Sequence, residues 1–206
     1  MIMTDRDLES GLNPRMERVY GLAKPGLFTL NLGAGETALG DVTADIDGAS
    51  RPDVILDATR LPFRDGSFDQ IIFADVIEHI PAGTEIRTLK EIQRVLNAGG
   101  RLILSTPNDR ALYTWTDPAH LLSGHRHYSV ARLKEFHGIA GLRAEQVFTA
   151  GGACACVDNF FVMSTSFSKR VRRDFLIRMV RREYAAPRDR GYTVFMVSMK
   201  AGANLA

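Results

Sequence analysis

A succession of short apolar runs, each closed by a residue that ends a strand, constrains the fold of this chain more than any other feature. Residues 27–32 run into a Gly-Ala-Gly turn, and residues 54–56 stop at an aspartate. Runs of this length predict buried strands. We expect further strands over residues 42–46, 69–74, 101–105, 147–148 and 192–199. Short apolar strands separated by helices or loops are typical of an α/β protein with a mostly parallel sheet.

Two segments between these strands have helical signals. Residues 77–96 place apolar side chains at steps of three and four, and we expect this helix to end at Gly99-Gly100. Ser129 is a good N-cap for a second helix that runs through Phe136.

The length of 206 residues, with 45% hydrophobic and 24% charged residues, indicates one globular domain over residues 1–206. Within it we expect an N-terminal extension over 1–26 and a basic helical insertion over 157–190, before the last strand. The first residues are acidic where an export signal is basic. No apolar run approaches the roughly 20 residues of a membrane span.

The two cysteines indicate the compartment. Cys154 and Cys156 are too close for an ordinary disulfide and lack the CxxC spacing of redox or zinc motifs. We therefore expect a reducing, cytoplasmic setting. The alternating Ala-Cys-Ala-Cys pattern most simply indicates a buried or half-buried strand.

The net charge of +2 hides a strongly basic segment. Residues 168–190 hold nine basic and three acidic residues, a net charge of +6 on an otherwise mildly acidic chain. Val171, Phe175 and Met179 belong to an apolar stripe with helical spacing in this segment. Three uses remain open: the solvated face of a core-packed helix, peripheral membrane contact, or a grip on an anionic substrate or nucleic acid. We favour the first by a narrow margin, because the stripe is spaced well enough to pack on the sheet.

Groups suited to a nucleoside ligand follow the first three predicted strands. The turn Gly33-Ala34-Gly35 lets a ligand approach the backbone closely. Asp45, at the tip of the second strand, can accept both hydroxyls of a ribose. Asp57, after the third, can accept from an exocyclic amine. Three strand ends in order, each with a suitable group, are far more specific than any one of them.

Five stretches of the chain, taken in sequence order, carry a resemblance to a known family. They are LNLGAG, TADID, ILDATRLPFRDGSFDQIIFADVIEHI, EIQRVLNAGGRLILSTPN and GHRHYSVARLKEFHGIAGL. With LPFRDGSFD, EH and RVLNAGG in succession, the chain resembles the class I S-adenosylmethionine-dependent methyltransferases, in particular those built on the type 11 methyltransferase domain. The resemblance implies a Rossmann-like α/β fold. Its seven-stranded sheet would be mostly parallel with an antiparallel last strand, and its cofactor would be S-adenosyl-L-methionine.

The resemblance also implies roles by position. The glycine turn would pass beneath the methionine part of the cofactor. Asp45 would hold the ribose, and Ile46 would cover one face of the adenine. Asp57 and Ala58 would meet the adenine edge, and Ala74 would offer its carbonyl to the methionine ammonium.

Methyl transfer is an in-line displacement at an already activated sulfonium methyl, so the protein mainly supplies positioning and electrostatics. A base is needed only for a poorly acidic hydroxyl or a protonated amine. The candidates are His125 and His127, after the fifth strand, and His79 beside the cofactor. A structural role is the alternative for each. Asp75 and Glu78 join His79 in a cluster similar to a metal site of some quinone-biosynthesis methyltransferases, but we expect no metal.

We predict O- or N-methyl transfer to a small-molecule, glycan or lipid-linked acceptor. One alternative is a cofactor-binding pseudoenzyme module, because only nine residues separate Gly35 from Asp45 and family members usually place a helix of several turns there. The other is a nucleic-acid methyltransferase, suggested by the arginines. We favour it less, because Thr106-Pro107-Asn108 is not the Asn/Asp-Pro-Pro-aromatic signature of amino-group methylation.

Overall fold

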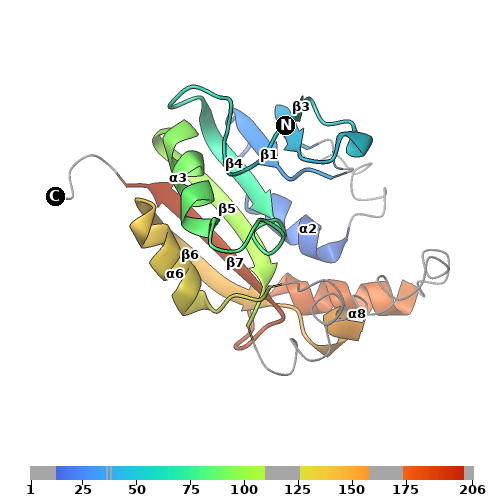
Figure 1. The fold of residues 1–206 in the computed structure, drawn as a ribbon. Coiled ribbons are helices and arrows are strands. Elements are labelled where there is room, and N and C mark those ends of the chain that lie inside the picture. Colours follow the sequence, from blue (N-terminus) through green and yellow to red (C-terminus); the bar gives the residue numbers. More distant parts are fainter. Residues whose placement is uncertain (1–12, 36, 38, 110–125, 158–173, 202–206) are drawn as a thin grey trace.

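Seven strands form one sheet in the order β3-β2-β1-β4-β5-β7-β6 in the computed structural model (Figure 1). The structure describes residues 13–35, 37, 39–109, 126–157 and 174–201. All strand pairs are parallel except the two that involve β7. The strands are β1 (Thr29–Leu32), β2 (Val42–Asp45), β3 (Val54–Ile55), β4 (Phe68–Ala74), β5 (Leu96–Pro107), β6 (Leu142–Ala150) and β7 (Thr193–Lys200). The predicted mostly parallel, seven-stranded α/β fold with an antiparallel last strand is confirmed.

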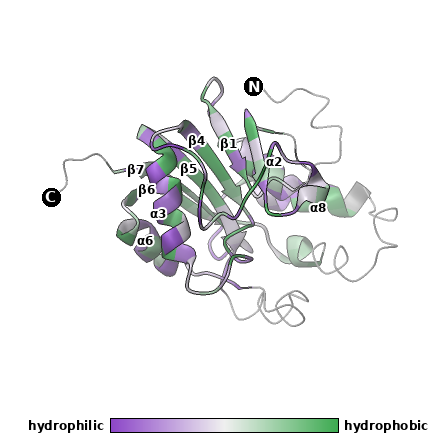
Figure 2. Ribbon diagram, turned by 45° about the horizontal axis from the view of Figure 1, so that its top comes forward, coloured by the Kyte–Doolittle hydropathy of each residue, from purple (hydrophilic) through white to green (hydrophobic). Residues whose placement is uncertain are grey.

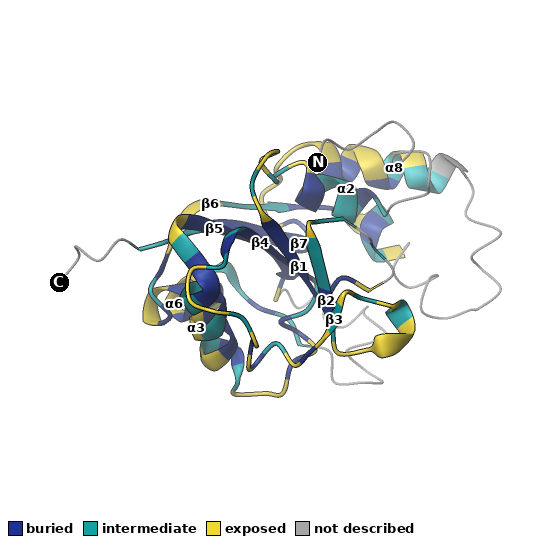
Figure 3. Ribbon diagram, turned by 90° about the horizontal axis from the view of Figure 1, so that it is seen from above, coloured by how far each residue is buried: buried dark blue, intermediate teal, exposed yellow. Residues whose placement is uncertain are grey.

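Helices cover both faces of the sheet. Figure 3 shows α2 (Pro14–Tyr20) and α8 (Asp174–Ala185) on one face and α3 (Glu85–Val95) and α6 (Val130–Ile139) on the other. A short 3₁₀ helix, η1 (Gly48–Ser50), precedes β3. The central strands include long hydrophobic stretches (Figure 2), because both of their faces are buried under helices.

Part of the predicted N-terminal extension packs on the sheet as α2. The Asn13 side chain accepts a hydrogen bond from the Arg15 amide, and Pro14 begins the helix, where its missing N–H costs nothing. Val19 and Tyr20 are buried in the same core cluster as residues of β4, β5 and β7.

Helix α3 is shorter at both ends than the predicted helix over 77–96. Residues 77–80 form turns, because Pro81 and the left-handed Gly83 interrupt a helix that would start there. At the other end the backbone becomes extended at Leu96, which pairs with Phe68 of β4. Strand pairing therefore ends the helix, and the predicted stop at Gly99-Gly100 lies inside β5.

The prediction of a strand at Ala-Cys-Ala-Cys is wrong. Residues 153–157 are helical, and both cysteines are free thiols. The reason is the buried carboxylate of Glu183 in α8, which accepts hydrogen bonds from the amides of Gly152, Cys154 and Ala155 at 2.9–3.2 Å. A carboxylate in this position stabilises the start of a helix.

The predicted helix start at Ser129 is confirmed. The Ser129 hydroxyl accepts a hydrogen bond from the Arg132 amide, and α6 follows directly. None of the helices in the described part of the chain is long and apolar enough to cross a bilayer.

The fold predicts a loss of stability in acid through His137. This side chain is fully buried in α6, with Nδ1 2.8 Å from the Ser198 hydroxyl of β7, and burial lowers its pKa to about 4. The unfolded histidine titrates near pH 6.5, so as pH falls from about 6.5 to 4 only the unfolded state gains the proton. We expect this site to lower the free energy of unfolding by about 2 kcal/mol between pH 7 and 5. Urea unfolding of the wild type and His137→Gln at both pH values checks this, and an unchanged pH dependence in the variant would contradict it.

Candidate cofactor and acceptor site

Gly33 and Gly35, in the turn after β1, have different structural roles. Gly33 and Gly35 both have left-handed backbones, with φ of 77° and 54°. A Cβ on Gly33 would lie 2.2 Å from Cγ2 of Val76, whereas a Cβ on Gly35 would meet nothing within 4 Å. Gly33 is therefore required for packing against the segment after β4. Gly35 borders open space, where a ligand can approach the backbone.

Asp45 connects this turn to the end of β2. Its Oδ2 accepts a hydrogen bond from the Gly35 amide at 2.8 Å, and its Oδ1 accepts one from the Asp47 amide at 2.9 Å. Each carboxylate oxygen has two acceptor sites, so capacity remains on both for further donors. The adjacent Ile46 is 73% exposed, an unusual setting for a large apolar side chain.

The connection between β1 and β2 is as short as the sequence indicated. None of its described residues within 33–41 is helical. The turn instead bonds directly to β2, because the amides of Gly33 and Ala34 both donate to the carbonyl of Ala44, at 2.7 and 3.1 Å. Together with the contact to Asp45, these bonds hold the turn in place without a following helix.

Asp57 follows β3 at the same edge of the sheet. It is exposed, and its Oδ1 accepts a hydrogen bond from the Thr59 amide at 2.8 Å. This bond lowers the pKa of Asp57, so the group stays an ionised acceptor. Arg94 of α3 holds the loop that follows, because it donates to the carbonyls of Leu61 and Phe63.

The end of β4 carries a strained acidic residue beside Ala74. Asp75 has a φ of 55°, which costs a non-glycine residue on the order of 1–3 kcal/mol. Its amide donates to the Ser105 carbonyl, its Oδ1 accepts from the Ser105 hydroxyl at 3.0 Å, and its Oδ2 lies 2.8 Å from Nε of Arg15. Strain that is held by several contacts is typical of functional sites.

Arg15 is a site residue that the sequence analysis missed. Burial disfavours its charge, but the Asp75 carboxylate raises its pKa above the ordinary value, so the guanidinium stays charged. Sixty residues separate the two partners in the chain. No local pattern points to such a pair, because only the packing of α2 brings Arg15 to β4.

Polar side chains line the ends of β4 and β5 on the expected acceptor side. The buried Glu78 accepts a hydrogen bond from the Thr106 hydroxyl at 3.0 Å. The Tyr128 hydroxyl donates to Glu85 at 2.9 Å, and burial together with the Glu85 charge raises the pKa of Tyr128. The first bond holds the turn after β4 to β5, and the second holds the segment before α6 to the start of α3.

The three candidate histidines differ in their placement. His127 lies at the acceptor side, with Nδ1 3.2 Å from the backbone carbonyl oxygen of Asn108. A carbonyl only accepts, so Nδ1 carries the proton of neutral His127 and Nε2 keeps the basic lone pair. His79 is exposed in the turn after β4, not at the start of a helix as predicted. His125 lies outside the described residues.

The acidic cluster offers no metal site in the structure. Asp75 and Glu78 are bonded to Arg15, Ser105 and Thr106, as described above. Among the described residues, no group of three or more histidine, cysteine, aspartate and glutamate side chains could hold a metal ion.

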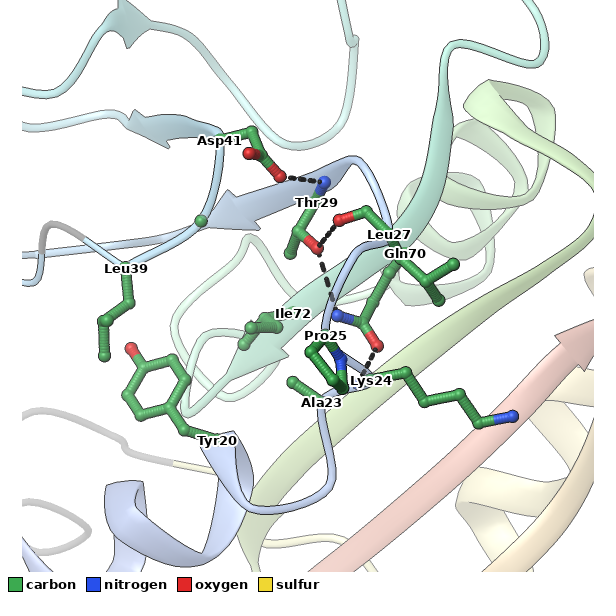
Figure 4. Close-up of a pocket in the computed structure, with 11 residues that line it drawn as sticks. Tyr20, Ala23, Lys24, Pro25, Leu27, Thr29, Leu39, Asp41, Gln70 and Ile72 are labelled. Atoms are coloured by element: carbon green, nitrogen blue, oxygen red, sulfur yellow. Dashed lines mark hydrogen bonds between the residues drawn. The ribbon is translucent and has the colours of Figure 1, made fainter. Parts of the chain in front are cut away.

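A separate hollow of about 200 Å³ lies at the opposite, N-terminal ends of β1 and β4 (Figure 4). Gln70 and Thr29 line it and bond to each other, and Gln70 also accepts from the Lys24 amide. Tyr20 and Leu39 add apolar surface. Because the glycine turn and Asp45 are at the C-terminal ends of the strands, this hollow is not part of the candidate site.

The comparisons with known proteins agree with this arrangement. Residues 40–104 match the family model described as "Methyltransferase domain". A SAM-dependent methyltransferase of Thermotoga maritima aligns with a TM-score of 0.61 and 18% identity, over 91% of this chain and 88% of that one. The chain has the class I methyltransferase fold. The resemblance seen in the sequence is thereby confirmed.

Curated proteins of two kinds match parts of the chain. The demethylmenaquinone methyltransferase of Mycobacterium sp. (strain KMS) is 44% identical over 70 residues, which are 31% of this chain and 28% of that protein. "Probable tRNA methyltransferase 9B" of Bos taurus is 32% identical over 114 residues, which are 48% of this chain and 25% of that protein. The chain thus spans about a quarter of the length of these relatives.

The close approach of Gly33 to Val76 predicts that a larger side chain at position 33 lowers the stability of the fold. Gly33→Ala introduces both a strained left-handed backbone and a steric clash with Val76. We therefore expect it to lower the free energy of unfolding by about 2–5 kcal/mol. Gly26→Ala, at φ 79° with open space, should lose only about 1–2 kcal/mol. Urea unfolding measures both. The double variant Gly33→Ala/Val76→Ala should be more stable than the sum of its single changes indicates, and simple additivity would contradict the clash.

Proposed function

We propose that this chain is an S-adenosylmethionine-dependent methyltransferase. The observation that carries the proposal is the hydrogen bond between the Gly35 amide and the Asp45 carboxylate. It brings an open glycine turn, a carboxylate with remaining acceptor capacity and the exposed Ile46 together at one edge of the sheet. These are the groups that a nucleoside with a charged amino-acid tail requires.

In this proposal each described group has one task toward the cofactor. Asp45 accepts the ribose hydroxyls, and Ile46 covers one face of the adenine. The ionised Asp57 accepts from the exocyclic amine beside the Ala58 amide. The carbonyl of Ala74 accepts from the methionine ammonium. When bound, the cofactor supplies a methyl group that its sulfonium already activates.

The acceptor is held, in this proposal, where β4 and β5 end. His127 acts as the general base, because the Asn108 carbonyl keeps its proton on Nδ1 and leaves Nε2 basic. The charged Arg15–Asp75 pair and the buried Glu78 position the acceptor and hold a fixed field at the reacting edge. His125 and His79 remain alternative bases.

The first candidate acceptor is a small molecule, glycan or lipid-linked compound that presents a hydroxyl or an amine. The similarity to proteins named demethylmenaquinone methyltransferase supports it, since that name gives a small-molecule acceptor and no nucleic acid. The second candidate is a nucleic acid. The similarity to tRNA methyltransferase relatives over 48% of the chain supports that candidate.

Cofactor binding tests the proposal directly. We expect S-adenosylhomocysteine to bind, and Asp45→Ala to weaken binding by about 1–3 kcal/mol, the scale of hydrogen bonds to a charged group. Asp53→Ala is the matched control, because Asp53 also accepts a backbone amide, from Thr43, but on the β2–β3 side. Isothermal titration calorimetry measures both. No heat and no thermal shift with the wild type at about millimolar ligand would refute the proposal and favour a fold without this function.

The rate of methyl transfer distinguishes a histidine that acts as the catalytic base from one that has only a structural role. We expect His127→Ala to slow transfer of a labelled methyl group by about 100- to 10,000-fold while its affinity for S-adenosylhomocysteine stays unchanged. His79→Ala should have a smaller effect, because its side chain is exposed in the turn. Single-turnover assays with phenolic, amine and RNA acceptors measure this, and normal turnover of His127→Ala would remove it from the mechanism.

A further inference from the structure

The outer face of α8 and the turn after it expose an unusual concentration of arginines. Residues 176–190 contain five arginines, no lysine and two acidic residues. All five arginines are exposed: Arg178, Arg181, Arg182, Arg188 and Arg190. We call them the α8 arginine surface. The basic residues Lys169, Arg170, Arg172 and Arg173 and the stripe residue Val171 of the same segment lie outside the described residues.

The acids of this segment are fewer than its arginines, so residues 176–190 carry a net charge of +3 from five arginines and two acids. Glu183 is buried, and its carboxylate is occupied by the backbone amides that begin the helical turn 153–157. Arg181 is bonded to Glu17 of α2 at 2.7 Å. Asp189 is the remaining acid of residues 176–190.

The apolar side of α8 is already used by the core. Val180 is 1% exposed and Tyr184 is 4% exposed, and the Tyr184 ring packs edge-on against Phe195 of β7. The exposed large apolar side chains of the described residues all lie outside α8. A helix that lies in a membrane surface must insert its apolar face. Leu176, Ile177 and Met179 are half-buried, so the exposed side chains in the described part of α8 are those of its three arginines and Ala185.

The turn after α8 leads directly to the candidate acceptor site. The carbonyls of Gly191 and Tyr192 accept from the side chain and the backbone amide of Asn108, both at 2.8 Å. The Asn108 carbonyl is the partner of His127. Arg188 and Arg190 therefore lie within a few residues of the segment that bonds to Asn108 at the reacting edge, and Figure 1 shows α8 followed directly by β7.

We infer that the α8 arginine surface binds the phosphate backbone of an RNA that serves as the methyl acceptor. Guanidinium groups pair with phosphates in two-pronged geometry and stack on the unstacked bases of RNA loops, which lysines do not do. The five exposed arginines are spread over residues 178–190, and a polymer with many phosphates can contact more of them than a single phosphate group can. The inference rests on the proposed methyl transfer for its purpose, and it deepens the second acceptor candidate.

The test compares two triple variants of the full chain that remove equal charge. Arg178→Ser/Arg182→Ser/Arg188→Ser removes part of the α8 arginine surface. The control, Arg60→Ser/Lys90→Ser/Lys134→Ser, removes three exposed cations from the loop after β3, α3 and α6. Fluorescence anisotropy with a labelled RNA hairpin measures binding over a range of salt, and thermal unfolding confirms that both variants fold.

We expect the α8 variant to bind RNA at least about tenfold more weakly than the wild type at about 50 mM salt. The slope of the logarithm of the binding constant against the logarithm of the salt concentration should be smaller in magnitude by about 2, because each lost phosphate contact with a single strand lowers that slope by about 0.7. The control should change affinity by less than about twofold. Equal losses in both variants, absence of RNA binding by the wild type, tighter binding to duplex DNA, or preferential binding to phosphatidylserine vesicles would each overturn the inference. Calorimetry with S-adenosylhomocysteine separates the two proposals. Cofactor binding without RNA binding refutes only this one. RNA binding without cofactor binding refutes the proposed methyl transfer, and with it the role of the RNA as acceptor, and leaves α8 as an RNA-binding surface alone.

Discussion

The contact between the Gly35 amide and the Asp45 carboxylate is the interaction on which the candidate site depends. It joins the ends of β1 and β2 at 2.8 Å, across a connection with no helix among its described residues. A longer connection would place a helix N-terminus beside the ligand and stabilise negative charge there. Here the Asp45 carboxylate orders the turn together with the Ala44 carbonyl, and the carboxylate still retains acceptor sites for a ligand. The same residue therefore serves both the fold and the proposed function.

The acceptor side depends on a second constraint, the strained backbone of Asp75. Its left-handed conformation persists because Ser105 and Arg15 hold it from β5 and from α2. Removing Arg15 would leave a nearly buried carboxylate without its charge partner, which is costly. The helix that precedes the sheet thus contributes directly to the electrostatics at the ends of β4 and β5. This explains why α2 is packed in the core and is more than a polar extension.

Helix α8 shows how one amphipathic element can serve two surfaces. Its apolar residues Val180 and Tyr184 complete the core under β7, and Glu183 organises the preceding helical turn. Its arginines then face outward because the inner positions are taken. The expectation of a core-packed helix is met for the described part of α8, and its outer face carries exposed arginines, of which Arg181 also pairs with Glu17 of α2.

The sequence by itself determined what local physical chemistry controls. The presence of seven strands, the glycine turn, the strand-end acids and the Ser129 cap could be predicted, because period and capping are short-range properties. The full lengths of β5 (Leu96–Pro107) and β6 (Leu142–Ala150) could not, since the predicted segments 101–105 and 147–148 cover only part of them. Long-range contacts decided the rest. Pairing of Leu96 with Phe68 ended α3 early, and the Glu183 carboxylate turned an alternating Cys segment into a helical turn. The strand order, the Arg15–Asp75 pair and the tautomer of His127 were equally beyond prediction. Each depends on groups that lie far apart in the chain. Local sequence patterns do not predict which of these groups meet, because only the packing of the sheet and its helices brings them together.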